Sequence, residues 1–300
     1  MGGIRVDFGA VRGKGVSLGC WMSGRVDKLS GFFNFAEGSY LERTARPVYA
    51  VVFLLPFVVF YEIGTLLINT DVLAQSQVRV VAFVWLRDLM RYVGFGSRFS
   101  WAAPALVVVV ILLALQVTSR KRWQVWIEDL WVMGAECVLL SVPLLVLTLF
   151  LNSTGGGQYG RAVDGAGAVV CAAGGEGPLM ANIVTGIGAG IYEELLFRLL
   201  LIGLLMLFFE DLLLFEKRTA LFLSVLASAV LFSAHHHIVF VNGRIGQMSP
   251  FNFTEFFFRA VAGVYFAGVF AIRGFGITAG THVFYDILAV VVNAVFFASR

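Results

Sequence analysis

Residues 186–203 read GIGAGIYEELLFRLLLIG and place Glu193, Glu194 and Arg198 in an otherwise apolar stretch. Without these three charges, the stretch would be typical of a helix that crosses a membrane. Each charge costs roughly 2.5–3.5 kcal/mol at the centre of such a helix on insertion scales, and intramembrane charges usually face a polar interior. The stretch therefore predicts a transmembrane helix whose charges have a structural or functional reason.

The spacing of the three charges divides their roles. Glu194 and Arg198 are four residues apart, so on a helix they share a face and can pair, whereas Glu193 is rotated by about 100°. An arginine within reach keeps Glu194 ionised and leaves Glu193 as the candidate proton acceptor. A buried ion pair that only fixes helix packing would account for Glu194 and Arg198, but it would not account for Glu193.

The composition of the whole chain indicates a membrane protein. Of its 300 residues, 59% are hydrophobic and 14% are charged, and the mean hydropathy is +0.87. We predict an all-α, polytopic transmembrane bundle with about seven spans and an interfacial helix near residues 78–93. The predicted spans cover residues 47–69, 101–117, 131–151, 182–209, 219–241, 254–272 and 275–297.

Charge and glycine content divide the chain into four parts. Residues 1–46 contain seven Lys and Arg residues and do not have the pattern of a signal peptide. This segment is therefore predicted to be a basic cytoplasmic tail. N-terminal transmembrane helices are expected at 47–151, a glycine-rich loop at 152–181 and a second transmembrane core at 182–297. We expect a multi-pass protein of the plasma (inner) membrane, with lipids and no nucleic acid as partners; the oligomeric state stays open.

Three of the four histidines follow one another at His235–His237, within the apolar run LFSAHHHIVF. If this run is helical, three successive side chains point about 100° apart and cannot converge on one metal ion. We therefore expect at most one of them, His236, to face the protein interior.

The last predicted span contains THVFYDIL, in which His282 and Asp286 are four residues apart and share a helix face. An aspartate that orients a buried histidine is the simplest interpretation of this pair. Together with Glu193 and His236, however, His282 completes a set of ionisable groups on three different helices, which predicts a site in the bundle interior.

Membrane depth presents a difficulty for this site. If the helices are straight and upright, His236 lies near the outer end of its span and His282 nearer the inner end of another. The two could then not meet at one water molecule. Helix tilt, a break in the glycine-rich start at Thr185–Gly190 or a re-entrant segment would be needed to bring them together.

The segments GIYEELLFR, FSAHH and HVFYD resemble the three signatures of the CPBP family of intramembrane endopeptidases, which includes the type II CAAX prenyl proteases. Those signatures are Glu-Glu-x-x-x-Arg, Phe-x-x-x-His, and His-x-x-x-Asn or a related form. Their order on successive apolar helices is also similar to the family. The resemblance covers residues 182–297.

The resemblance implies a glutamate-dependent hydrolase that cuts a peptide bond within or next to the membrane, with a peptide or prenylated protein as substrate. Glu193 would act as the general base on a water that His236 positions. His282 would stabilise the oxyanion, a role that requires a hydrogen-bond donor.

The remaining matched residues have supporting roles or depart from the family pattern. Glu194 and Arg198 would hold the helix. Asp286 stands where the family often has asparagine, and an ionised carboxylate cannot donate a hydrogen bond. Asp286 would therefore either be protonated or orient His282.

Other interpretations use the same residues. One glutamate with two histidines is also a plausible zinc set. Because the His-Glu-x-x-His arrangement is missing, we expect no cofactor and keep zinc as the lesser alternative. A catalytically silent family member that acts as a membrane scaffold or bacteriocin-immunity protein is a further alternative. A proton-coupled transporter is less favoured, because the two halves show no matched broken helices.

Overall fold

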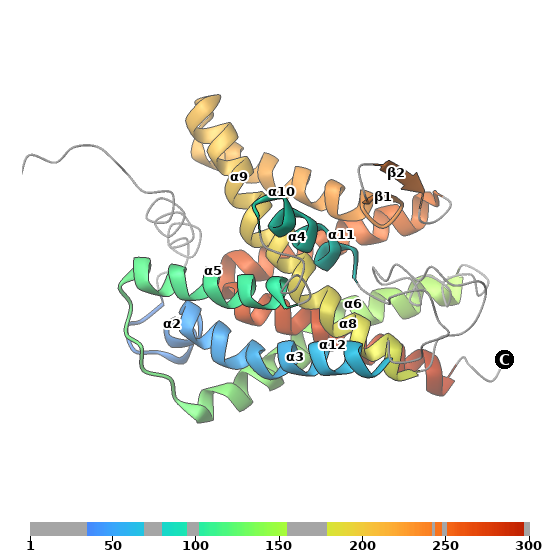
Figure 1. Ribbon diagram of the computed structural model, residues 1–300, viewed down its shortest axis with the longest axis horizontal. Coiled ribbons are helices and arrows are strands. Elements are labelled where there is room, and N and C mark those ends of the chain that lie inside the picture. Colours follow the sequence, from blue (N-terminus) through green and yellow to red (C-terminus); the bar gives the residue numbers. More distant parts are fainter. Residues whose placement is uncertain are drawn as a thin grey trace, which may run out of the picture.

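The computed structural model describes residues 35–68, 80–94, 102–154, 179–241, 244–247 and 251–296. Most of the predicted basic tail (residues 1–34) and of the glycine-rich loop (155–178) lies outside these residues. The helical elements, shown in Figure 1, are α2 Tyr40–Thr44, α3 Pro47–Ile68, α4 Val81–Tyr92, α5 Ala103–Ser119, α6 Ile127–Thr154, α8 Leu179–Glu194, η2 Leu195–Leu201, α9 Ile202–Met206, η3 Leu207–Leu212, α10 Lys217–Ala234, α11 Phe253–Arg273 and α12 Phe275–Phe296.

The predicted helical membrane bundle is confirmed. Among the described residues, five helices are long and apolar enough to cross a membrane: α3, α6, α10, α11 and α12. The other two predicted spans correspond to α5, a shorter apolar helix, and to the continuous helical stretch from α8 to η3. Within that stretch, η2 and η3 are π-helical turns.

The prediction of one helix over residues 219–241 is wrong at its C-terminal end. Helix α10 stops at Ala234, and the chain continues through a turn into strand β1, Ile238–Val241. This strand pairs antiparallel with β2, Arg244–Gln247, so that Ile238 lies opposite Gln247. The β-branched residues of β1 suit an extended strand, and they look like a helix extension only because they are apolar.

Helix α12 lies at the centre of the bundle. About 72% of its apolar window is buried, the largest share among the five candidate spans. It packs against α8, α6, α3 and α11, and Figure 1 shows α12 alongside α8 within the layer that also holds α3. Helices α10 and α11 pack on each other and cross this layer obliquely in the upper part of the view.

Glycines let α8 approach both of its neighbours closely. A Cβ atom at Gly190 would lie 2.6 Å from the backbone nitrogen of Val283 on α12, and one at Gly186 would lie 2.8 Å from Cβ of Asp286. On the other side, a Cβ at Gly188 would lie 2.2 Å from the ring of Tyr61 on α3. The helix is continuous through these glycines, so the expected alternative of a break at Thr185–Gly190 is wrong; they serve close packing instead.

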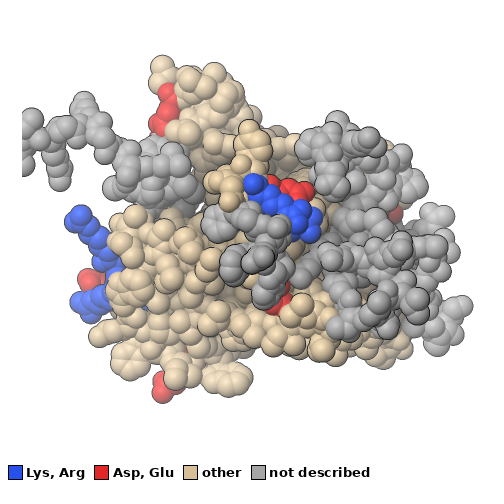
Figure 2. Space-filling model, in the orientation of Figure 1, with Lys and Arg blue, Asp and Glu red and all other residues tan. Residues whose placement is uncertain are grey.

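Helix α4 agrees with the predicted interfacial helix, because its 12 residues are too few to span a bilayer. Its first turn, Val81–Val84, is buried on all sides, Leu86 is also buried, and the helix packs against α5 and α8. Figure 2 shows Lys and Arg side chains gathered over α4 and, separately, at the end of the molecule where α5 ends.

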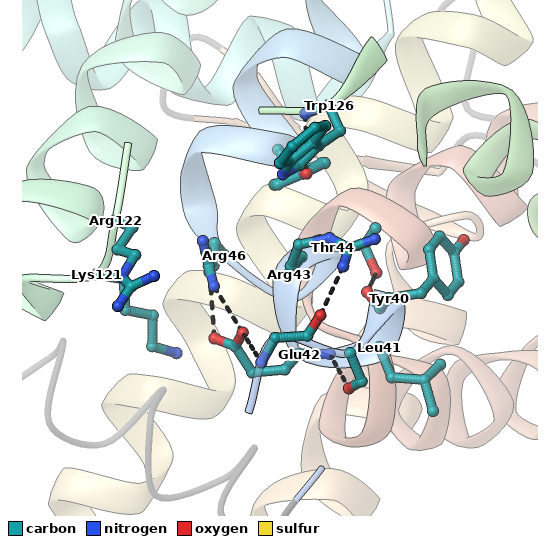
Figure 3. Close-up of polar contacts among 12 residues, drawn as sticks. Tyr40, Leu41, Glu42, Arg43, Thr44, Arg46, Lys121, Arg122 and Trp126 are labelled. Atoms are coloured by element: carbon teal, nitrogen blue, oxygen red, sulfur yellow. Dashed lines mark hydrogen bonds and ion pairs between the residues drawn. The ribbon is translucent and has the colours of Figure 1, made fainter. Parts of the chain in front are cut away.

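The short helix α2 is attached to the bundle by ion pairs. Arg43 donates two hydrogen bonds of 2.9 Å to the carboxylate of Asp129 in α6, and the Tyr49 hydroxyl donates to the same carboxylate at 2.7 Å. Arg46 pairs with Glu42 at 2.6 Å, as Figure 3 shows, and these hydrogen bonds lower the pKa of Glu42. The described end of the N-terminal segment is thus fixed against α6.

Substitution of Gly190 tests the close contact of α8 with α12. Because backbone atoms of Val283 cannot yield to a new methyl group, we expect Gly190→Ala to destabilise the protein by about 1–3 kcal/mol. Gly203→Ala is the matched control, since a Cβ there meets nothing within 4 Å. Thermal unfolding in detergent should show a lower Tm for the first variant only. Equal Tm values would contradict the packing role of Gly190.

Candidate active site

A cavity lies where α8, α10, α11 and α12 meet, with α6 at one side. Its empty volume is about 670 Å³, including its open mouth. The residues that line it are Thr148, Ala189, Glu193, Phe232, His236, Glu255, Phe258, Arg259, Ala262, Phe266, His282, Tyr285 and Asp286. The four residues predicted to be catalytic from the sequence, Glu193, His236, His282 and Asp286, all contribute to this lining.

Glu193 is placed by the last turn of α8, where only 1% of its side chain is exposed. Its Oε1 lies 3.3 Å from Nε2 of His235, and its Oε2 lies 4.0 Å from Nε2 of His236. Of the two histidines, His236 lines the cavity together with Glu193, whereas His235 is not among the lining residues. Glu193 therefore borders the cavity and also contacts a histidine outside the lining.

The expectation that at most one histidine of the triplet faces inward is wrong. His235 to His237 follow the end of α10 and form a turn, with the His236 and His237 amides donating to the carbonyls of Ser233 and Ala234. The 100° rotation per residue of a regular helix therefore does not apply. The rings of His235 and His236 lie 4.0 Å apart between centroids, and both face Glu193.

His235 is a functional candidate that the sequence interpretation missed. Its Nδ1 lies 2.5 Å from the carbonyl oxygen of Phe232. A carbonyl oxygen only accepts, so Nδ1 carries a hydrogen and Nε2 is turned toward Glu193. Trp85 of α4 and Phe197 of η2 pack against the ring, with centroid distances of 6.0 and 4.8 Å. The Phe-x-x-x-His spacing selects only His236, and no other sequence signal distinguishes its neighbour.

Glu194 connects two helices through its two oxygens. Oε2 lies 3.0 Å from Nε of Arg198, which is the ion pair predicted from the four-residue spacing. Oε1 lies 2.7 Å from Nδ1 of His282 on α12. The side chains of Glu194 and Arg198 are at most 1% exposed, and Arg198 also donates to the carbonyl of Gly263 on α11 at 3.4 Å. Glu194 and Arg198 together thus connect α8, η2, α11 and α12.

Asp286 lies close to His282 without a normal hydrogen bond. Its Oδ2 is 3.6 Å from Nε2 of His282, which is longer than a hydrogen bond, while the opposite ring nitrogen is bound by Glu194. The ring is therefore oriented by Glu194, which the sequence analysis assigned only to helix support, and not by Asp286.

Two phenylalanines surround the buried guanidinium. Arg198 lies 4.2 Å from the ring centroid of Phe232 and 5.5 Å from that of Phe266. Phe266 also stacks on His282 at 4.5 Å, and Phe232 contacts the ring of His236 at 5.3 Å. Such contacts stabilise a cation by about 2 kcal/mol when it is desolvated. The phenylalanine of the second motif thus packs between the arginine of the first and the histidine of the second.

The difficulty with membrane depth disappears in the folded chain, where His236 and His282 line the same cavity. Two features bring them together. Helix α10 ends before the histidines, and α10 and α11 cross obliquely over α12, as Figure 1 shows. The assumption that one continuous helix carries His236 toward its outer end was therefore wrong.

Glu193, His235 and His236 also have a geometry that could hold a metal ion. One ligand atom from each lies within 4.8 Å of the other two, and all three residues are buried. Two histidines of the triplet can converge because residues 235–237 form a turn and not the expected helix. Glutamate and histidine are common zinc ligands, so the residues present fit such an ion.

Comparison with known families agrees with the motifs. Residues 175–299, about two fifths of the chain, match the family model described as type II CAAX prenyl endopeptidase Rce1-like. This match spans α8 to α12 and includes all three motifs, so the family resemblance is confirmed over this part of the chain. No curated protein and no solved structure matches the chain.

Arg198→Met tests the buried ion pair. The substitution removes the permanent cation that pairs with the buried Glu194, so we expect a loss of about 3–5 kcal/mol in unfolding free energy. A double variant, Glu194→Gln with Arg198→Met, should recover part of this loss. The matched control is Arg87→Met on α4, where the partly exposed pair with Asp88 should contribute about 1 kcal/mol or less.

Unfolding monitored in detergent measures all three variants. If Arg198→Met were as stable as Arg87→Met, the central position given to the Glu194 and Arg198 pair would be contradicted.

Proposed function

From the family match, we propose that this protein is an intramembrane endopeptidase that hydrolyses a peptide bond in or near the bilayer. The observation that carries the proposal is the position of Glu193. It is a buried carboxylate that contacts His235 and lines the same cavity as His236 and His282. A charge at that depth in a membrane protein is expensive, and such residues are usually functional.

Glu193 acts as the general base. The separation of 4.0 Å between its Oε2 and Nε2 of His236 allows both groups to contact one water at the cavity wall. Glu193 takes a proton from this water while the water oxygen attacks the carbonyl carbon of the substrate. When the intermediate collapses and the C–N bond breaks, Glu193 returns the proton to the leaving amine.

His282 stabilises the oxyanion that forms during the attack. Because its Nδ1 donates to Glu194, its Nε2 can donate only in the imidazolium form. Asp286, 3.6 Å from Nε2, balances the charge of that form when it is ionised. A donor fixed in advance toward a developing negative charge is worth several kcal/mol of transition-state stabilisation.

The cavity suits a peptide attached to the membrane. Apolar side chains from α11, among them Phe258 and Ala262, form part of its wall. The substrates proposed are therefore membrane-tethered peptides or prenylated proteins, and the membrane is proposed to be the plasma (inner) membrane. No cofactor is needed for the steps described.

A metal-dependent form of the same hydrolysis is the second candidate. It is supported by the convergence of Glu193, His235 and His236 within 4.8 Å. A bound zinc ion would polarise the peptide carbonyl and activate water. In that case Glu193 would be a ligand and another group would have to accept the proton.

Glu193→Gln should abolish cleavage. The amide keeps the size of the side chain but cannot accept the proton, so we expect a fall of at least about 10²-fold in the rate. The assay uses purified protein and a panel of membrane-tethered peptides, prenylated and not. The control is Glu62→Gln, since Glu62 accepts a hydrogen bond from Tyr192 at 3.2 Å outside the cavity. Equal losses in both variants would contradict the assignment of Glu193 as base.

A chelator separates the two candidate mechanisms. For the metal-free mechanism, activity is expected to stay unchanged in the chelator and after added zinc. Loss of activity in the chelator with recovery on zinc would instead support the metal-dependent form. In that second case, His235→Ala should also lower zinc affinity, which can be measured by binding of the ion to the purified protein.

A further inference from the structure

A second charged pair lies in the cavity, at some distance from the groups that perform hydrolysis. Arg259 and Glu255 stand on the same face of α11, four residues apart, and both line the cavity wall. Their side chains are 14% and 21% exposed, compared with 1% for Glu193 and 7% for His236. The pair therefore lies toward the cavity mouth, while the hydrolytic groups lie at its closed end.

The contact within this pair is loose. Nη1 of Arg259 lies 3.4 Å from Oε2 of Glu255, whereas hydrogen bonds between a guanidinium and a carboxylate are normally about 2.7–2.9 Å. A guanidinium has five donors in a planar fork and binds a carboxylate best through two parallel bonds. The single contact of 3.4 Å is therefore a weak one, and a carboxylate that forms two parallel bonds would bind the guanidinium more strongly than Glu255 does.

The charge of Arg259 acts within the cavity. It interacts electrostatically with His236 and Tyr285, two other lining residues, from its position on α11. A substrate whose scissile bond lies at Glu193 must therefore place its neighbouring residues close to the guanidinium. Glu193 and Arg259 line the same cavity, so a peptide bound there lies along a wall that holds both side chains.

We infer that Arg259 is a specificity-determining residue that binds a carboxylate of the substrate in exchange for Glu255. This inference rests on the proposed peptidase function. The carboxylate has two available sources, the C-terminal α-carboxylate of a peptide cut near its end or an acidic side chain near the cut bond. In both cases, binding at Arg259 aligns the peptide before Glu193 activates the water.

The test compares three forms of a membrane-tethered peptide that the protein cleaves: a free C-terminal acid, its C-terminal amide, and the amide with one glutamate near the cut bond. Charge-assisted hydrogen bonds predict that kcat/KM falls about 10- to 100-fold when no carboxylate is present. The form that keeps the full rate identifies the source of the carboxylate.

Variants of Arg259 and Glu255 test whether these two residues cause the preference for a carboxylate. Arg259→Ala should remove the preference between the three peptides, mainly through KM, and Arg259→Lys should restore part of it. Glu255→Gln should lower KM several-fold for the preferred peptide, because the neutral amide no longer competes for the guanidinium. A purely structural ion pair would give no such gain. Arg87→Ala on α4 is the matched control and should keep the parent preference, and Tm values check that each variant is folded.

Two results would overturn the inference alone: equal cleavage of all three peptides by the parent protein, or a preference that Arg259→Ala retains. If the parent protein cleaved no peptide of any form, the proposed function itself would be contradicted, and this inference with it.

Discussion

Arg198 and Glu194 meet at 3.0 Å with almost no exposure, in a part of the chain where their neighbours are apolar. Removing both charges from water is costly, and their attraction offsets the cost only if the remaining donors and acceptors are also satisfied. Here the second carboxylate oxygen binds His282 and Nη2 of the guanidinium donates to the carbonyl of Gly263. Nη1 has no hydrogen-bond partner among the described residues, and the ring of Phe232 covers the guanidinium instead. The ion pair therefore requires α8, α10 and α12 to meet at one place, and that requirement creates the site.

Close backbone packing makes this meeting geometrically feasible. The 2.7 Å contact between Glu194 and His282 joins side chains from two different helices. It forms because Gly186 and Gly190 allow α8 to lie directly against α12, where larger residues would hold the helices apart. Since α12 is also the most buried of the candidate spans, its histidine is surrounded by protein and not by lipid.

The adjacent glutamates have different surroundings as a result. Glu194 is bound by an arginine and a histidine and has a structural and orienting position. Among the described residues, the polar groups closest to Glu193 are the histidine rings at 3.3 and 4.0 Å, and Glu193 lines the cavity. Of these two adjacent glutamates, Glu194 is thus a fixed anion and Glu193 is placed to react. Different surroundings commonly separate the acid and base roles of identical side chains in this way.

By itself, the sequence determined the helical membrane fold, the resemblance of residues 182–297 to the endopeptidase family and the pairing of Glu194 with Arg198. Helical periodicity and hydropathy are local properties, so they can be read from the sequence. Only the tertiary structure decided that α10 ends at Ala234, that His235 contacts Glu193, and that Glu194 orients the histidine of α12. The period of a helix fixes which of its residues share a face. It does not fix where the helix ends, how far it tilts or which neighbour packs against it, and these are decided by the burial and charge pairing of the whole bundle.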